Sequence, residues 1–324
     1  MTSLMKTLMA ATVATAMFGL ATANAADVTL KLGHLANEDN IWNKASLYFG
    51  EQVKKLSDGR IEVKVYPNET LGKEMDLING MQLGTVDMTI TGESLQNWAP
   101  KAALLAVPYA YSSLEQMDKV ASGEVGKEIE QQIIEKARVR PIAYFARGPR
   151  NLTSNKPIKT PDDLNGLKMR VPNVPLFVDT WRALGANPVP MAFSEVFTSL
   201  QNGTIDGQEN PLALIKSASF AEVQKYVNLT QHVRSWIYLT ISEKTFEGLS
   251  EEDQKAVLEA GKMTQAYERD LFTKDEEQLR KDLEAAGMTF VDVDQAAFKE
   301  KAKPAVLKSV PEDLRPTVEK LFAE

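Results

Sequence analysis

The sequence predicts an α/β protein with two lobes of similar construction. Three observations support this prediction. Segments with the alternation of a β-strand and segments with helically spaced apolar residues follow one another from residue 28 to residue 212. The hexapeptide QLGTVD at 82–87 recurs as QNGTID at 201–206. A run without proline, residues 250–285, carries helical spacing over a length that exceeds one small domain.

The first 25 residues have the features of an export signal peptide. Lys6 is the only charged residue before Asp27, an apolar run follows at 8–21, and residues 23–25 read ANA, a small-x-small cleavage pattern. A membrane anchor is the alternative, but the run is too short and too rich in alanine and threonine. Cleavage after Ala25 shortens the chain from 324 residues by 25, to 299. The loss of Lys6 changes the net charge from −7 to −8.

Length and composition describe an exported protein without disulfide bonds. A chain of this length buries a large core and corresponds to about two domains. It has no cysteine, which also excludes a lipid-modified N-terminal cysteine. No second long apolar segment follows the signal, so we expect the mature protein not to be embedded in a membrane. The acidic balance argues against nucleic acid as a partner.

The first part of the mature chain alternates between strands and helices. We expect strands at 28–34, 60–66 and 85–91 and helices at 41–56 and 74–83. His34 ends the first strand and is followed by a polar loop that contains Asn37. Glu93 comes directly after the strand at 85–91.

Two arginines stand at strand edges in the stretch 147–212, around which the chain is organised. The alternation in residues 167–171, LKMRV, places Arg170 near the end of a strand. Arg150 follows the apolar run 141–146, so we expect it just past a strand end. In open α/β sheets, ligands bind outside the carboxyl ends of strands, where a guanidinium can grip a carboxylate with two parallel hydrogen bonds. The alternative is an arginine in a surface salt bridge.

The same stretch continues with further α/β elements. We expect a helix at 175–184, a short strand at Val189, a helix between Ser194 and Gly203, and a strand at 204–207. Asn210 follows the last of these strands, so a third polar group is expected at the same kind of position. An ordinary turn residue is the alternative for Asn210.

The repeated hexapeptide supports the division into two lobes. Four of its six positions are identical in the two copies. In each copy a helix ends at glycine, a strand begins, and a polar residue, Glu93 or Asn210, follows the strand. We therefore expect each lobe to offer a strand-end site, with a ligand lying between the lobes.

The last part of the chain is mainly helical. Ser250 opens the long helix in the style of a capping box, and the pattern continues to residue 285. Two helices that break near residues 261–263 are the alternative, because Gly261 weakens the run. A strand at 289–293 and a helical tail at 295–322, interrupted at Pro304 and Pro311, complete the prediction.

Motifs of catalysis are not present in the sequence. There is no G-x-S-x-G elbow, no phosphate-binding loop, no dinucleotide fingerprint, no cysteine nucleophile and no H-E-x-x-H. The two histidines, His34 and His232, lie far apart in the sequence and are more typical of hydrogen-bonding or core-edge residues than of zinc ligands. We predict a protein that is not an enzyme and that has no cofactor or metal.

Ordered landmarks in the chain resemble the periplasmic solute-binding proteins of TRAP (tripartite ATP-independent periplasmic) transporters, of the DctP type. The landmarks are GPR at 148–150, TSNKPI at 153–158, PDDL at 161–164, GLKMRVP at 166–172, LGA at 184–186, SEV at 194–196 and DGQENP at 206–211. The resemblance covers essentially the whole mature chain.

The resemblance implies a two-lobed periplasmic binding protein fold, with a cleft between the lobes and a long helix that spans both. We expect lobe I to comprise residues 26–147 plus about 236–262. We expect lobe II to comprise 148–235 plus about 288–324. The long helix is expected at about 250–286.

The resemblance also assigns roles to residues in the cleft. Arg170 would form the central salt bridge to a ligand carboxylate, and Arg150 and Asn210 would complete the grip. Glu93 matches a position that meets the hydroxyl end of the ligand. Four further cleft residues are expected from their positions: His34, Asn37, Phe193 and Trp236.

The implied function is binding without chemistry. A periplasmic monomer would capture a small organic acid and deliver it to membrane permease subunits that couple uptake to a sodium gradient. The polar cleft candidates favour a sugar acid, such as a uronate or an aldonate. A four-carbon dicarboxylate, a sialic acid and a keto acid are alternatives. A periplasmic sensor for a receptor kinase and a hydrolase or lyase are alternative function classes.

Overall fold

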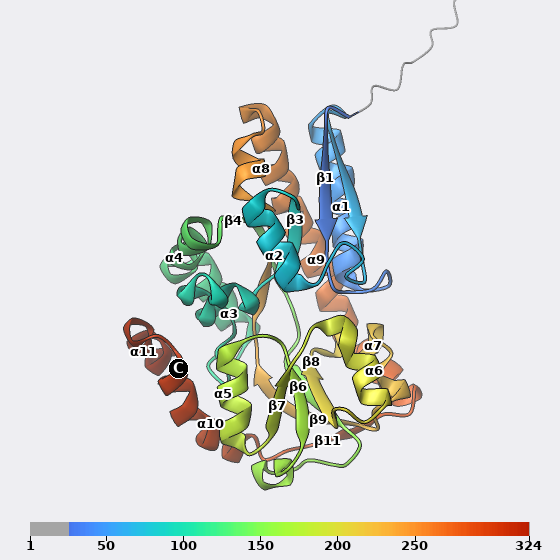
Figure 1. Cartoon of the computed structure of the whole chain (residues 1–324), viewed down its shortest axis with the longest axis vertical. Helices are drawn as coiled ribbons and strands as arrows, with labels where there is room; N and C mark the ends of the chain where they lie inside the picture. Colours follow the sequence, from blue (N-terminus) through green and yellow to red (C-terminus); the bar gives the residue numbers. More distant parts are fainter. Residues whose placement is uncertain (1–25, 324) are drawn as a thin grey trace, which may run out of the picture.

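A computed structural model gives the structure of residues 26–323. These residues form two lobes, each built on its own β-sheet (Figure 1). The predicted signal peptide, residues 1–25, lies outside the described residues. Within residues 26–323, no helix combines the length and the apolar character that crossing a membrane requires.

The first lobe contains a five-stranded sheet in the order β2-β1-β3-β10-β4. Strand β1 is parallel to β2 and β3, whereas β10 is antiparallel to β3 and β4. The strands are β1 (Val28–Gly33), β2 (Ile61–Tyr66), β3 (Met88–Thr91), β4 (Val139–Ala146) and β10 (Trp236–Ser242).

The second lobe contains a six-stranded sheet in the order β11-β9-β5-β8-β6-β7. Its strands are β5 (Arg150–Ser154), β6 (Lys168–Val171), β7 (Asn187–Pro190), β8 (Gly207–Asn210), β9 (Tyr226–Val233) and β11 (Thr289–Val291). Strand β5 is antiparallel to β8, and β6 is parallel to β8. The start of β5 therefore lies at the same sheet edge as the ends of β6 and β8.

Helices cover both sheets. They are α1 (Ile41–Leu56), α2 (Glu74–Leu83), α3 (Leu114–Ser122), α4 (Glu124–Gln132), α5 (Pro175–Leu184), α6 (Val196–Gln201), α7 (Leu212–Ser217), α8 (Glu243–Glu247), α9 (Glu251–Ala285), α10 (Gln295–Ser309) and α11 (Arg315–Ala323). The predicted limits of α1, α2 and α5 are confirmed. Local signals explain this: Asn40 caps the start of α1 by accepting the N–H of Trp42, and glycines with positive φ, Gly84 and Gly185, end α2 and α5.

Helix α9 is one continuous helix of 35 residues, so the alternative break near residues 261–263 does not occur. Gly261 has a packing role there, because a Cβ atom at this position would lie 2.6 Å from the carbonyl oxygen of Ile142 in β4. Helix α9 packs against α1 and β4 in the first lobe and against α7 in the second. It therefore spans both lobes, as predicted.

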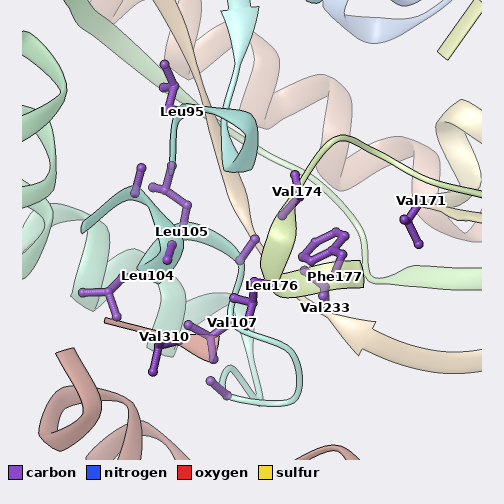
Figure 2. Packing of buried hydrophobic residues seen from close by; sticks show 14 of the residues in the cluster. Leu95, Leu104, Leu105, Val107, Val171, Val174, Leu176, Phe177, Val233 and Val310 are labelled. Atoms are coloured by element: carbon purple, nitrogen blue, oxygen red, sulfur yellow. The ribbon is translucent and has the colours of Figure 1, made fainter. Parts of the chain in front are cut away.

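One large hydrophobic core runs from the first lobe into the second. Its residues come from α2, from the segment between β3 and β4, from α5 and from α10 and α11. Figure 2 shows Leu104, Leu105 and Val107 facing Leu176 and Val310 in this core. Burying a large apolar side chain stabilises the fold by about 1.5 to 3 kcal/mol, so this core ties the helical segments to the second sheet.

Several elements differ from the sequence prediction. Strand β3 begins at Met88 and not at residue 85, and β11 ends at Val291 and not at residue 293. Strand β8 begins at Gly207 and not at residue 204, because Thr204 is held in a turn by the side chain of Asn202, which accepts the N–H of Thr204 at 3.0 Å. The predicted interruption at Pro304 is wrong, since α10 continues through this proline. Its buried residues pack against α5, and this packing offsets the hydrogen bond that proline removes.

Candidate functional site

Two adjoining cavities lie between the lobes, and four residues line both of them: Glu74, Arg170, Pro172 and Phe193. The outer cavity has a volume of about 360 Å³. The inner cavity has a volume of about 30 Å³, which corresponds to roughly one water molecule. Pockets for small ligands usually start at about 300 Å³, so the outer cavity supplies the space for a ligand.

Five of the predicted site residues line the inner cavity. They are Glu93, Arg150, Arg170, Phe193 and Asn210. The sheet topology explains why they meet, since the start of β5 carries Arg150 and the ends of β6 and β8 carry Arg170 and Asn210 at one edge. The position of Arg150 differs in one respect from the prediction, because Arg150 opens β5 and does not simply follow β4.

Arg170 is buried and has no acidic partner in the described part of the chain. Its side chain is 4% exposed, and its Nε and Nη2 atoms donate to the carbonyl oxygen of Met191 at 3.1 and 2.8 Å. The ring of Phe193 lies 5.8 Å from the guanidinium carbon. Burial lowers the pKa of Arg170 to about 10, which leaves it charged at neutral pH. A buried cation without a counter-ion is unfavourable, so this site is suited to an anion.

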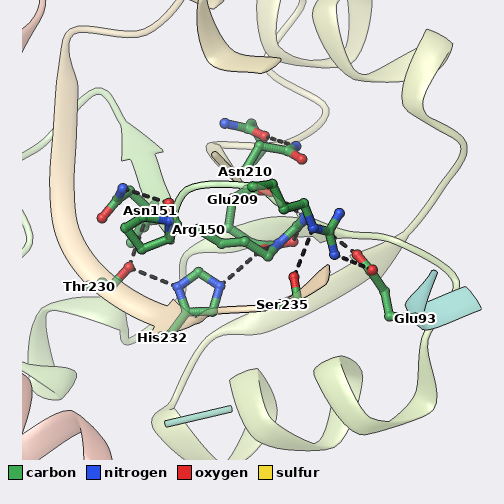
Figure 3. Close-up of polar contacts among 12 residues, drawn as sticks. Glu93, Arg150, Asn151, Glu209, Asn210, Thr230, His232 and Ser235 are labelled. Atoms are coloured by element: carbon green, nitrogen blue, oxygen red, sulfur yellow. Dashed lines mark hydrogen bonds and ion pairs between the residues drawn. The ribbon is translucent and has the colours of Figure 1, made fainter. Parts of the chain in front are cut away.

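Arg150, in contrast, is paired with acidic residues of the protein (Figure 3). Both carboxylate oxygens of Glu209 accept from it, with Nη2 to Oε1 at 2.7 Å, and Nη2 also donates to the Glu209 carbonyl oxygen at 2.8 Å. His232 Nε2 lies 2.8 Å from Glu209 Oε2, and Thr230 Oγ1 lies 2.9 Å from His232 Nδ1. Burial opposes the ionisation of Glu209, but Arg150 and His232 outweigh it and lower the pKa of Glu209 to about 2.

Glu93 bridges two arginines at the other side of this network. It pairs with Arg147 and, at 3.3 Å, with Nη1 of Arg150. Arg147 also donates from Nε to Ser235 Oγ at 2.8 Å. Burial favours the neutral form of Glu93, but the two arginines outweigh it and lower its pKa. Glu93 therefore lies at the cavity with its charge already balanced by the protein.

Three other predicted residues lie away from both cavities. Asn37 lines a separate groove and donates from Nδ2 to the carbonyl oxygen of Ser217 at 2.5 Å, which links the two lobes. Trp236 is fully buried in the hydrophobic core and packs edge-on against Tyr111 at 5.8 Å. His34 is buried beside Asn43. It supports the site through its backbone, whose carbonyl accepts the N–H of Glu69.

The burial of His34 makes the stability depend on pH. Burial lowers the pKa of His34 from 6.5 to about 4, so the folded state resists protonation. The stability that the neutral imidazole contributes is present above pH 6.5 and is lost as the pH falls towards 4. We expect the free energy of unfolding to fall by about 2 kcal/mol more between pH 7 and pH 5 in the wild type than in His34→Gln. Urea unfolding at both pH values measures this, and equal pH slopes would contradict it.

Several ionisable residues of the site were not predicted from the sequence to belong to it: Arg147, Glu209, His232 and Glu74. Arg147 and Glu209 lie within three residues of the predicted ligand-binding residues Arg150 and Asn210, and only this proximity in the sequence could have indicated that they belong to the site. Glu74 is the first residue of α2, where the helix dipole accounts for an acid without any ligand. His232 gave no local signal, because its role depends on Glu209 in a neighbouring part of the fold.

Polar contacts hold the two lobes together at the outer cavity. Lys73 of the first lobe forms an ion pair with Glu195 of the second at 2.8 Å. Glu69 accepts the backbone N–H of Ser194 at 3.1 Å. Asn97 donates to the carbonyl oxygen of Asn173 at 2.9 Å. The structure is therefore a closed arrangement, in which both lobes contribute walls to the cavities.

Known proteins of one family resemble this chain over most of its length. Residues 32–313 match the family described as bacterial extracellular solute-binding protein, family 7 (DctP). A solute-binding protein of Roseobacter denitrificans is 68% identical over 316 residues, which cover 98% of this chain and 97% of that protein. The 2,3-diketo-L-gulonate-binding periplasmic protein YiaO of Escherichia coli is 32% identical over 298 residues, 90% of each chain.

Solved structures give the same result. A TRAP periplasmic solute-binding protein from Roseobacter denitrificans with bound L-galactonate superposes with a TM-score of 0.91 at 70% identity, covering 92% of this chain and 99% of that one. One from a Sulfitobacter species with bound β-D-galacturonate superposes with a TM-score of 0.85 at 31% identity, covering 91% and 98%. These matches confirm the predicted resemblance and the two-lobed fold. This chain belongs to the DctP family of TRAP periplasmic solute-binding proteins.

Proposed function

We propose that this protein captures a sugar acid, an aldonate or a uronate, between its lobes and delivers it to the membrane permease of a TRAP transporter. One observation supports this most strongly: the buried guanidinium of Arg170 faces a cavity of about 360 Å³ and has no acidic partner among residues 26–323. A ligand carboxylate supplies the missing counter-ion. Relatives that bind L-galactonate and β-D-galacturonate support the ligand class.

In this proposal the other predicted residues have supporting roles. Asn210 and Phe193 shape the inner cavity next to Arg170. Arg150 contributes through Nη1, whose bond to Glu93 is the longest in its network at 3.3 Å and can be exchanged for a ligand oxygen. Residues 1–25 direct export to the periplasm and are removed after Ala25. Sequencing the amino terminus of the exported protein tests that cleavage site.

Thermal unfolding of the mature protein tests the ligand class. A ligand at 100 times its Kd stabilises the folded state by about 2.7 kcal/mol, and a melting temperature shifts by roughly 2 to 4 °C for each kcal/mol in chains of similar size. We expect shifts with L-galactonate or D-galacturonate and none with galactitol, which has the hydroxyls but no carboxylate. A shift with galactitol, or with succinate alone, would contradict the proposed ligand class.

The ion pair between Lys73 and Glu195 is expected to strengthen ligand binding, because it forms between the lobes beside the cavity. Both side chains are about half exposed, at 47% and 49%, so the effect should be modest. We expect Lys73→Met to weaken binding about two- to fivefold at low salt and less at high salt. The exchanged pair Lys73→Glu/Glu195→Lys should recover part of the loss.

Lys274→Met is the matched control, since Lys274 forms an exposed ion pair with Asp270 within α9. Calorimetric titration at low and high salt measures all of these variants. Equal affinity in Lys73→Met and the wild type at low salt would show that the ion pair has no role in closure.

A further inference from the structure

We infer that the outer cavity selects acids that carry a single carboxylate and rejects those with a second carboxylate at the far end. This inference rests on the proposed function, because it assumes that one carboxylate pairs with Arg170. The inference concerns the wall of the outer cavity, which the part of the ligand beyond this carboxylate would contact. In chemical terms, the expected ligand is an aldonate or a uronate, and an aldarate of the same length is excluded.

The charges on the wall of the outer cavity are mostly negative. The wall contains two basic residues, Lys73 and Arg170, and four acidic ones, Glu69, Glu74, Asp76 and Glu195. Lys73 is already paired with Glu195 at 2.8 Å. Within residues 26–323, none of the other three acids has a basic partner within 4 Å. Of the described residues that form this wall, Arg170 is therefore the one cation that is left for a ligand.

Glu74 and Glu69 lie close enough to Arg170 that their charges act on it, because both raise the pKa of its guanidinium against the effect of burial. Glu74 lines both cavities and is fixed by Thr91 Oγ1 at 2.7 Å and Ser94 Oγ at 2.9 Å. Glu93, the acid next to Glu74, is already paired with Arg147 and Arg150. Once Arg170 binds the first ligand carboxylate, no unpaired cation of this wall is left among the described residues to neutralise a second one.

One carboxylate oxygen of Glu69 can accept a hydrogen bond from a ligand. Its Oε2 atom accepts the N–H of Ser194, while its Oε1 atom is buried without a hydrogen-bond partner among the described residues. The carboxylates of Glu69 and Glu74 are acceptors when ionised, so they match hydroxyl groups, which donate. A ligand carboxylate has no proton to donate and adds repulsion between like charges. The wall thus suits a polyhydroxylated chain and opposes a second acid group.

A pair of ligands isolates this effect. L-Galactonate and galactarate have the same carbon chain and the same hydroxyl configuration, and differ only in the oxidation of the terminal CH₂OH to a carboxylate. Galactarate has a carboxylate at each end, so neither orientation keeps an acid group away from the wall. We expect galactarate to bind the mature protein at least about 100-fold more weakly than L-galactonate in calorimetric titrations at neutral pH.

Removing the charge of a wall acid, or of the second ligand carboxylate, should reduce the difference in affinity between L-galactonate and galactarate. We expect Glu74→Gln and Glu69→Gln to reduce the ratio of the two affinities about tenfold, while Glu277→Gln, an exposed change on α9 with the same loss of charge, leaves the ratio unchanged. The monoamide of galactarate tests the same point in the wild type without any variant, and should bind within about tenfold of L-galactonate.

Each outcome is informative. Equal affinity for galactonate and galactarate would overturn this inference and leave the proposed function intact. A difference that persists in both glutamine variants and with the monoamide would also overturn it, because the wall acids would not be its cause. If no sugar acid binds at all, the proposed function itself fails.

Discussion

Replacing Arg170 with alanine is expected to weaken sugar-acid binding by about 3 to 5 kcal/mol, or roughly 150- to 5,000-fold, while the protein stays folded. Among residues 26–323, Arg170 is the only cation lining the outer cavity that has no acidic partner, and the variant loses it. Arg170→Lys should also bind weakly, because an ammonium group cannot reproduce two parallel hydrogen bonds to a carboxylate. Calorimetric titration with L-galactonate measures both variants.

The stability of the unliganded protein separates this role from a structural one. In the absence of ligand, the buried guanidinium of Arg170 has only the carbonyl oxygen of Met191 as a hydrogen-bond partner in the described chain. We therefore expect Arg170→Met to keep or raise the melting temperature of the unliganded protein. Arg182→Met is the control, since Arg182 is 62% exposed on α5 and should affect neither property. A large fall in melting temperature for Arg170→Met would show that this arginine holds the fold together.

Replacing Glu209 with glutamine is expected to lower the free energy of unfolding by about 3 to 5 kcal/mol at pH 7. Glu209 has no exposed surface, and its carboxylate is the main counter-ion of Arg150. Without that charge, Arg150 remains buried with Glu93, at 3.3 Å, as its one acidic partner in the described part of the chain. Urea unfolding followed by circular dichroism measures the loss, and Glu277→Gln on the surface of α9 should change the stability by less than about 0.5 kcal/mol.

The effect of Glu209→Gln should become smaller in acid. The folded protein lowers the pKa of Glu209 from 4.5 to about 2, so the stabilisation that its ionisation provides is complete above pH 4.5 and is lost as the pH falls through 2. The stabilisation from the ionisation of Glu209 amounts to about 3 kcal/mol at pH 7, of which about 2 kcal/mol is lost by pH 3. The wild type and the variant should therefore converge between pH 7 and pH 3. A constant difference would contradict the assignment of the charge to Glu209.

A double variant tests whether the ion pair between Arg150 and Glu209 stabilises the fold, or whether the loss in the single variant comes from leaving one charge buried without its partner. Arg150→Met/Glu209→Leu removes both charges and replaces them with apolar side chains of similar volume. We expect it to be more stable than Glu209→Gln alone, because no buried charge is left without its partner. A double variant as unstable as the sum of the two single changes would show that Arg150 and Glu209 act independently.

The sequence predicted the limits of secondary-structure elements best where neighbouring residues determine them. The limits of α1, α2 and α5 follow from apolar spacing, a capping asparagine and glycines with positive φ, all within a few residues of the helix ends. Local patterns were weaker guides where packing competes with them. Pro304 reads as a break, yet the contact of α10 with α5 holds the helix together. Strand β8 starts three residues later than expected, because a side-chain turn competes with the strand.

For the site, the sequence by itself determined which residues are available: arginines at the edges of β5 and β6, Asn210 after the second copy of the hexapeptide, and Glu93 after the first. Only the tertiary structure decided how their charges pair. Glu209 lies 59 positions from Arg150, and Glu93 lies 57 positions from it. These contacts depend on how strands of two sheets are placed together, which no local pattern encodes. The physical result is that the acids of the protein neutralise Arg147 and Arg150, whereas Arg170 keeps a positive charge that faces the cavity.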